Sequence, residues 1–251
     1  SSVIVGEEDF DLTENTPSDT SGHGTGVAGI VVYGDFHNYD RENRIFVPLV
    51  RICNGKVMHR DTSYDQTVYR SDKRPEQIIG ETIRYFHKEY HCRIFNLSSG
   101  DIERVYSGGR QMAWAAVLDE IARELDVVIV ISAGNVAYPE IPTFMDREDL
   151  MAKCRDQLLS GKHQLIDPAT SALGVTVGSI TRYAEPEGEP SRPTPISVGN
   201  EDYPSVFTRV GEGVGGAVKL EFVDYGGNLA LTQLYTNFPR WRSNRALNEP
   251  T

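Results

Sequence analysis

Residues 127–135 read Val-Val-Ile-Val-Ile-Ser-Ala-Gly-Asn, an unbroken apolar run followed by small residues and an asparagine. The β-branched run predicts a strand that is buried on both faces of a parallel sheet. Ligands of parallel α/β sheets bind beyond the carboxyl ends of the strands, which is where this run places Asn135. A side-chain amide in that position could donate a hydrogen bond to a developing oxyanion. The alternative is a turn asparagine after a glycine, which is a common use of this residue.

Two segments with the periodicity of a helix precede this strand. Residues 110–125 carry apolar side chains along one stripe, and residues 92–97 predict the strand before that helix. An earlier helix is predicted to begin at Pro75, because proline suits the first helical position. The apolar face of this earlier helix has the spacing of Ile79, Ile83, Phe86 and Tyr90.

The alternation of strands and helices is the signature of βαβ units. It predicts an α/β fold with a three-layer, doubly wound, mostly parallel sheet. Polar composition predicts loops over residues 54–74 and 182–204. Further strands are predicted at residues 45–53, 174–180 and 217–223.

Residues 21–33 begin Ser-Gly-His-Gly-Thr-Gly and continue with small and apolar residues. This composition predicts a buried helix that starts in a glycine-rich turn, where another chain can approach closely. An imidazole beside such a turn could stand in a cleft. Histidine titrates near neutral pH, so His23 is a candidate general base. The alternative is a surface or core histidine with no catalytic role.

Residues 96–100, Asn-Leu-Ser-Ser-Gly, follow another predicted strand. Small residues and a glycine leave a strand edge open, and an extended peptide could pair with that edge through backbone hydrogen bonds. The alternative is a simple turn from strand to loop.

In this order the segments resemble those of the subtilisin superfamily (subtilases, peptidase S8). Residues 23–29, His-Gly-Thr-Gly-Val-Ala-Gly, match every fixed position of the family's histidine motif. Residues 96–100 resemble the segment that lines the substrate cleft, and residues 132–135 resemble the segment that ends in the oxyanion-hole asparagine. Two later stretches, residues 167–178 and 207–223, are also similar to family segments.

The resemblance implies a subtilisin-like serine endopeptidase that hydrolyses peptide bonds through an acyl-enzyme. His23 would act as general base and then as general acid, and Asn135 would donate its amide to the tetrahedral oxyanion. On this interpretation both side chains face one groove. The substrate backbone would be bound by Ser98, Ser99, Gly100, Ala133 and Gly134.

Two family motifs are missing. No Asp-Thr-Gly or Asp-Ser-Gly precedes the histidine, and no Gly-Thr-Ser occurs in the chain. We interpret Asp9, Asp11 and Asp19 as solvated loop charges. Residues 1–251 are therefore expected to be one subtilisin-like domain, truncated at both ends, of a protease whose triad Asp and Ser lie elsewhere. The alternatives are a catalytically inactive subtilase-like domain that binds peptides and an unrelated α/β ligand-binding domain.

The net charge of −11, from 25 basic and 36 acidic residues, disfavours nucleic acid and anionic membranes as partners. A peptide or protein is the expected partner, and the sequence leaves the oligomeric state open. No apolar run approaches the roughly 20 residues that a transmembrane helix needs. We therefore expect no membrane span.

The three cysteines have long spacings and form no Cys-x-x-Cys pair. This pattern predicts reduced thiols in a cytoplasmic protein, with an extracellular protein that has lost its leader as the alternative. No cofactor motif is present. Calcium sites are common among subtilases, but no Asp-rich loop has the spacing of metal ligands, and residues 7–19 are expected to be a solvated acidic loop.

Overall fold

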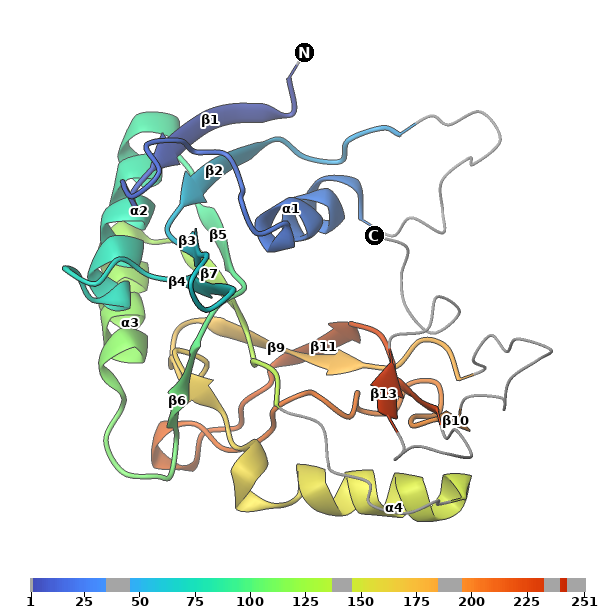
Figure 1. Cartoon of the computed structure of the whole chain (residues 1–251). Helices are drawn as coiled ribbons and strands as arrows, with labels where there is room; N and C mark the ends of the chain where they lie inside the picture. Colours follow the sequence, from blue (N-terminus) through green and yellow to red (C-terminus); the bar gives the residue numbers. More distant parts are fainter. Residues whose placement is uncertain (1, 35–45, 137–145, 185–195, 233–239, 243–251) are drawn as a thin grey trace. The chain divides into compact units, whose positions relative to one another are not determined.

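The computed structural model describes residues 2–34, 46–136, 146–184, 196–232 and 240–242. The chain forms two compact units, which can be followed by colour in Figure 1. The first unit is built from residues 1–95 and 117–129, and the second from residues 96–116 and 130–250.

A parallel pair of strands organises the first unit. β1 (Ile4–Asp9) pairs with β2 (Ile52–Lys56), and Gly6 lies opposite Cys53 in their register. Both strands are short, and glycine within each lets a neighbouring helix lie close to the ladder.

The strand predicted at residues 45–53 lies further along the chain, because β2 begins only at Ile52. Pro48 lies outside the ladder, where its missing N–H breaks no strand hydrogen bond. The stretch 54–74, predicted as a loop, contains the end of β2 and an antiparallel hairpin of β3 (His59–Asp61) and β4 (Gln66–Val68).

The structure confirms the helix predicted from Pro75, α2 (Pro75–Tyr90). Ile79, Ile83 and Phe86 on its predicted face are buried, whereas Tyr90 remains 39% exposed. Full burial of one such side chain contributes about 1.5–3 kcal/mol. The apolar face of α2 is therefore a main source of stability in the first unit.

A second confirmed helix, α3 (Ala113–Leu125), packs against α2, and the two lie side by side in Figure 1. Gly80 permits this approach, because a Cβ on Gly80 would lie 3.3 Å from the Ile121 side chain. Exposed Arg84 and Glu124 form an ion pair across the same contact, with 2.7 Å between nitrogen and oxygen.

The helix predicted to be buried, α1 (His23–Tyr33), forms but is largely exposed. Only Val32 is buried, while Ile30 and Val31 are 54% and 40% exposed. Its apolar residues do not gather into one stripe, so no single face of the helix can be buried efficiently. The expected glycine-rich start is correct, since Gly22 at the N-cap has a φ of 86°.

A four-stranded sheet of order β11-β9-β7-β5 confirms the parallel α/β character of the fold. β9 (Val175–Ile180) runs parallel to β7 (Val128–Ser132) and to β11 (Phe222–Tyr225), and β5 (Ile94–Leu97) lies beyond β7. β11 is at the end of this order, and Phe222 is 63% exposed.

The expectation that residues 127–132 are buried on both faces is wrong. In β7, Ile129 and Ile131 are fully buried, while Val128 is 46% exposed. Alternate strand residues point to opposite faces of a sheet, so one face of β7 carries the core contacts.

Short antiparallel elements complete the second unit. β6 (Asp101–Val105) pairs with β8 (Ile166–Asp167). The last strand of the sheet was predicted at residues 217–223 and occupies Phe222–Tyr225 instead. A separate sheet follows, built from β10 (Ile196–Ser197), β12 (Ala230–Thr232) and β13 (Arg240–Arg242).

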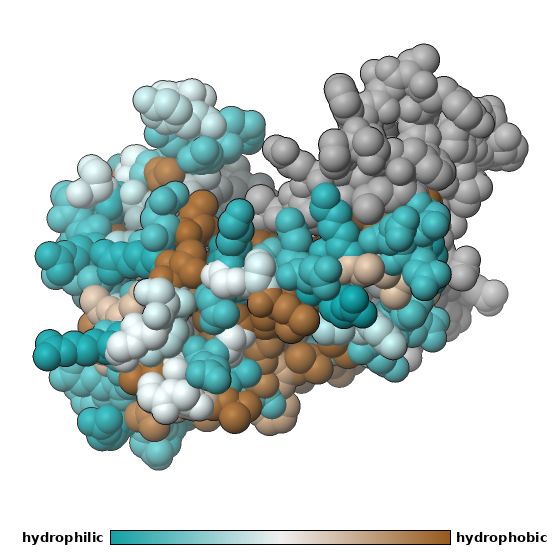
Figure 2. All heavy atoms as spheres, turned by 90° about the horizontal axis from the view of Figure 1, so that it is seen from below, coloured by the Kyte–Doolittle hydropathy of each residue, from teal (hydrophilic) through white to brown (hydrophobic). Residues whose placement is uncertain are grey.

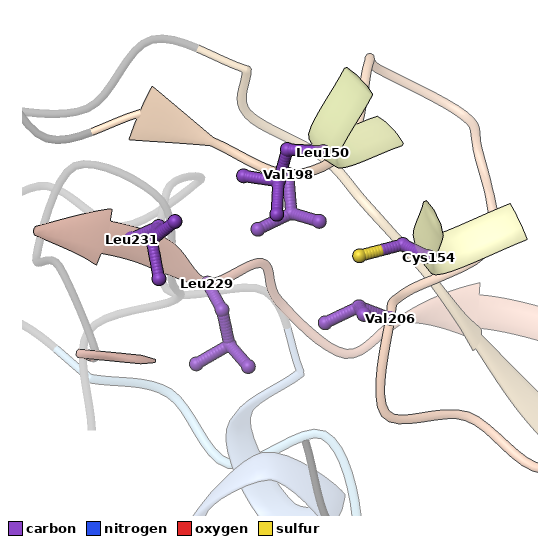
Figure 3. Close-up of a cluster of buried hydrophobic side chains, with 6 residues drawn as sticks. All are labelled: Leu150, Cys154, Val198, Val206, Leu229 and Leu231. Carbon is purple, nitrogen blue, oxygen red and sulfur yellow. The ribbon is translucent and has the colours of Figure 1, made fainter. Parts of the chain in front are cut away.

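One helix that was not predicted from the sequence, α4 (Arg147–Leu158), covers the core of the second unit. Asp146 caps this helix by accepting the Asp149 N–H at 2.9 Å. Leu150 and Cys154, one turn apart, point into the cluster in Figure 3. The other members of that cluster are Val198, Val206, Leu229 and Leu231.

The surface carries both hydrophobic and hydrophilic side chains. Figure 2 shows hydrophobic patches between hydrophilic side chains on one face. Exposed apolar residues include Leu159 and Val218, at 79% and 87% exposure. Among the helices of the described residues, none has the length and apolar character needed to span a membrane.

A buried carboxylate ties α3 to β8. Asp167 is fully buried and accepts the backbone N–H groups of Trp114 and Ala115 at 3.1 and 2.8 Å, one on each carboxylate oxygen. These donors lie in the first turn of α3, where a negative charge is favourable. Arg104 provides a positive charge, 3.8 Å from Asp167.

We expect Asp167→Asn to destabilise the protein, because the new NH₂ group would face a backbone N–H donor. Each charge-assisted hydrogen bond is worth about 1.5–3 kcal/mol, so the free energy of unfolding should fall by about 3 kcal/mol. Urea denaturation measures this change. Asp156→Asn, at a side chain that is 73% exposed, is the matched control. Equal stability of the two variants would contradict the role given to Asp167.

Candidate active site

The candidate oxyanion residue lies three positions after the end of β7, and its backbone is held on both sides. Ala133 N–H donates to Val177 O at 2.9 Å, and Val136 N–H donates to Phe207 O at 2.9 Å. Asn135 itself forms a bridge with Thr208. Its side chain is exposed, and its amide makes no hydrogen bond to any residue that the structure describes.

Ile166 brings two of the predicted segments together within the second unit. A Cβ on Gly134 would lie 2.7 Å from the Ile166 side chain, and a Cβ on Gly100 would lie 2.9 Å from it. Both glycines are therefore needed for this close packing. Ser98 and Ser99 are half-buried and lie between β5 and β6, in the same unit as Asn135.

A buried arginine fixes the Asn135 loop. The Arg209 Nε donates to Asn135 O at 3.0 Å, and its Nη1 donates to Gln164 O at 2.9 Å. The Arg209 backbone N–H also donates to Gly134 O at 3.3 Å. One planar guanidinium thus connects the segment after β7 to the segment before β8, a geometry that suits arginine's fixed fork of donors.

Burial of the Arg209 charge is energetically costly, because the residue is only 6% exposed and its side chain donates, within the described residues, to two carbonyl oxygens and to no carboxylate. Desolvation lowers its pKa. Nearby His163 is also buried, and desolvation followed by the charge of Arg209 lowers the pKa of that imidazole. The role of Arg209 was not predicted from the sequence. A lone arginine in the apolar run Val-Phe-Thr-Arg-Val is the signal that could have revealed it.

His23 lies in the first unit, as the first residue of α1, and is exposed. The turn that leads to it is organised by Asp19. Its Oδ1 accepts the N–H groups of Ser21 and Gly22, at 2.8 and 3.0 Å. Its Oδ2 accepts the Thr25 N–H at 2.7 Å and the Thr25 hydroxyl at 2.8 Å. Asp19 therefore caps α1 from outside the helix.

The charge of Asp19 is stabilised by these donors. Partial burial raises the pKa of its carboxyl, but the hydrogen bonds from Thr25, Ser21 and Gly22 lower it by more. The pKa consequently lies well below its ordinary value of 3.8. Asp19 lies at the surface in a loop, as expected, but its role in organising the turn before His23 was not predicted.

Asp9 and Asp11, in contrast, are not solvated loop charges, being only 9% and 1% exposed. Asp9 ends β1, and its carboxylate accepts the N–H groups of Asp11, Leu12 and Thr16 at 2.9–3.0 Å. The Asp11 carboxylate lies 3.0 Å from His59 Nδ1. Carboxylates in an apparently polar stretch are buried because local backbone donors satisfy them.

The hydrogen bonds and ion pairs of these carboxylates also decide whether residues 7–19 could bind a cation. Glu14 pairs with buried Lys56, whose hydrogen bond holds the pKa of Glu14 below its ordinary value. Across the described residues, no group of three or more His, Cys, Asp or Glu side chains is arranged to hold a metal ion. Asp9, Asp11, Glu14 and Asp19 thus already have protein partners, and we assign no calcium ligands to them.

The chain matches the subtilase family (peptidase S8) over residues 1–249. It belongs to the subtilase family. A curated relative is the uncharacterized protein y4bN of Sinorhizobium fredii (strain NBRC 101917 / NGR234). The two are 43% identical over 154 residues, which is 59% of this subtilase and 34% of y4bN. The chain thus spans about a third of the length of this relative.

Solved subtilisin-like structures are similar to this subtilase over nearly its whole length. MycP1 without its N-terminal propeptide matches 98% of the chain and 67% of its own, with a TM-score of 0.50 and 19% identity. The protease domain of PatA, as a serine-to-alanine mutant, matches 93% of the chain and 64% of its own, with a TM-score of 0.45 and 14% identity. The likeness to MycP1 confirms the subtilisin-like α/β fold. The family is one of serine proteases acting on peptides or proteins.

Asp19→Asn should loosen the turn before His23, because a single amide oxygen cannot replace both carboxylate oxygens. Loss of such a cap costs about 1 kcal/mol, so exchange of the Thr25 amide should accelerate roughly fivefold. Amide exchange followed by NMR measures this change. Asp65→Asn is the control, since Asp65 is exposed and asparagine tolerates its φ of 53°.

The same hydrogen bonds set a pH dependence. The folded pKa of Asp19 is below its unfolded value, so its stabilisation is complete above pH 3.8 and is lost as pH falls through the folded pKa. Protection of the Thr25 amide, corrected for intrinsic exchange, should weaken in that window in the wild type but not in Asp19→Asn. A pH profile shared by both proteins would refute this assignment.

Arg209→Lys should release the Asn135 loop, because one ammonium cannot span the two carbonyl oxygens that the guanidinium fork joins. Loss of a charged hydrogen bond in a buried place costs about 1.5–3 kcal/mol of unfolding free energy. Exchange of the Val136 amide should become faster. Arg155→Lys on exposed α4 is the control. Unchanged exchange at Val136 would show that Arg209 does not hold the loop.

Proposed function

We propose that the full-length protein is a serine endopeptidase that cleaves peptide bonds through an acyl-enzyme. The observation that carries this proposal is the hydrogen bonding of Asn135, which differs between its backbone and its side chain. Its backbone is locked to Thr208 and Arg209, while its exposed amide has no hydrogen bond within the described residues. A donor whose backbone is held in place needs less reorganisation when charge develops on a substrate oxygen.

In this proposal His23 is the base that accepts a proton from the attacking serine and later returns it to the leaving amine. Its place at the exposed start of α1, after a turn anchored by Asp19, supports access to a substrate. Asn135 acts on the same substrate, as the family resemblance implies. The Asp and Ser that complete the triad are assigned to the longer protein, because neither of their motifs occurs among the 251 residues.

The substrate chain would bind beside Ile166. Ser98, Ser99 and Gly100 form one wall, and Ala133 and Gly134 form the other. The small side chains of these residues would let an extended peptide approach the backbone closely and pair with the chain as an added strand. We propose that backbone pairing positions the scissile carbonyl near Asn135.

The experiment is active-site labelling of the full-length protein with a fluorophosphonate, which reacts only with an activated serine. We expect labelling of the wild type and none of His23→Ala. Asn135→Ala should lower turnover of a peptide substrate by about 100- to 1,000-fold, the loss known for subtilisin, the type case of this effect.

His91→Asn is the matched control, because His91 is exposed and has a φ of 57°, which asparagine tolerates. It should label at the wild-type rate. Undiminished labelling of His23→Ala would exclude His23 as the base. A full-length protein that binds peptides but is never labelled would instead be an inactive subtilase-like binding domain.

A further inference from the structure

Two cysteines of the first unit are brought together by the way α2 lies on β1 and β2. Residues i and i+2 of a strand point to the same face, so Cys53 shares a face with Gly55. That face is covered by α2, because a Cβ on Gly55 would lie 2.6 Å from the Thr82 side chain and 2.9 Å from the Phe86 ring. The Cys53 side chain is therefore directed toward α2.

The last turn of α2 lies over Cys53 itself. Gly6 is the register partner of Cys53, and a Cβ on Gly6 would lie 2.5 Å from the Tyr90 ring. Further along β1, the Tyr85 hydroxyl donates to Glu8 at 3.2 Å. Gly55 therefore lies under the middle of α2, and Cys53 lies nearer to the C-terminal end of that helix.

The second cysteine follows that C-terminus and folds back onto it. The chain reverses at His91, whose φ is 57°. Cys92 N–H then donates to Phe86 O at 3.2 Å, and Cys92 O lies 3.1 Å from His87 Nδ1. These contacts hold Cys92 against the last turn, beside the strand that carries Cys53.

The electrostatic environment of Cys53 agrees with a position close to Cys92. Burial, followed by the interaction with the Cys92 thiol, raises the pKa of Cys53 to about 11. Both thiols are half-buried, so a small solute can reach them. Cys154 differs, because it lies in the α4 core of the second unit and is only 5% exposed.

We propose that Cys53 and Cys92 are a redox-active pair that forms an intramolecular disulfide with a small-molecule disulfide such as oxidised glutathione. One thiolate attacks a glutathione sulfur, which breaks the glutathione S–S bond and releases one glutathione thiolate. The second cysteine loses its proton to solvent and attacks the mixed disulfide, which releases the second glutathione. Two protein thiols are oxidised, and one glutathione disulfide is reduced to two thiols.

The bond would join β2 to the short segment between α2 and β5 and close a loop of about 40 residues around α2. Loop closure restricts the unfolded chain, so the oxidised protein should melt at a temperature higher by on the order of 5 °C. The effect belongs to the first unit and does not depend on protease activity.

The test treats the folded chain at low micromolar concentration with oxidised glutathione, alkylates it after denaturation and measures its intact mass. The wild type should lose two hydrogens and keep one alkylated thiol. Trypsin should release residues 52–56 disulfide-linked to residues 89–93. Cys154→Ser, the matched control, should form the same bond, and reductant should reverse it.

Cys92→Ser should instead stop at one glutathione adduct on Cys53. Three alkylated thiols in the treated wild type, or a persistent glutathione adduct without the linked peptides, would overturn the proposal. The measurement on wild-type protein needs no mutation, so a variant that fails to fold leaves the result decisive.

Discussion

The Asn135 loop depends on one buried cation. Arg209 joins the carbonyl oxygens of Asn135 and Gln164, two segments that are far apart in the sequence but adjacent in the second unit. Because the Arg209 side chain is buried, water cannot take the place of its donors. A substitution that removes these donors therefore leaves buried carbonyl groups unpaired. The desolvated charge of Arg209 is the energetic cost of this arrangement. The backbone that carries the exposed amide of Asn135 is thereby held in place.

Long, periodic segments made much of the fold predictable. α2, α3, β7 and β9 follow from helical spacing or from β-branched runs, because burial of apolar side chains contributes most to their formation. The β3–β4 hairpin and α4 were missed, since turns and a weakly amphipathic helix leave little pattern in the sequence. α1 was predicted correctly as a helix but wrongly as buried, because small residues suit a packed helix and an exposed one equally.

The site was predictable where it is local and hidden where it depends on tertiary contacts. The motifs around His23 and Asn135 are contiguous, so the family resemblance locates them. Asp19 and Arg209 act through backbone groups, and the sequence around Asp19 does not distinguish it from a surface charge, whereas the apolar run around Arg209 was a signal that went unused. Burial of Asp9 and Asp11 was missed because nearby N–H donors compensate their charge only in the folded chain.

The position of β11 at the end of its sheet has a consequence for handling this polypeptide. Among the strands that the structure describes, only β9 pairs with β11, and Phe222 and Val223 are more than half exposed. A strand with an open side and apolar residues is a template on which another extended chain can add. Concentrated solutions of the isolated polypeptide should therefore self-associate through this border, and a lysine or proline placed there would improve its colloidal behaviour.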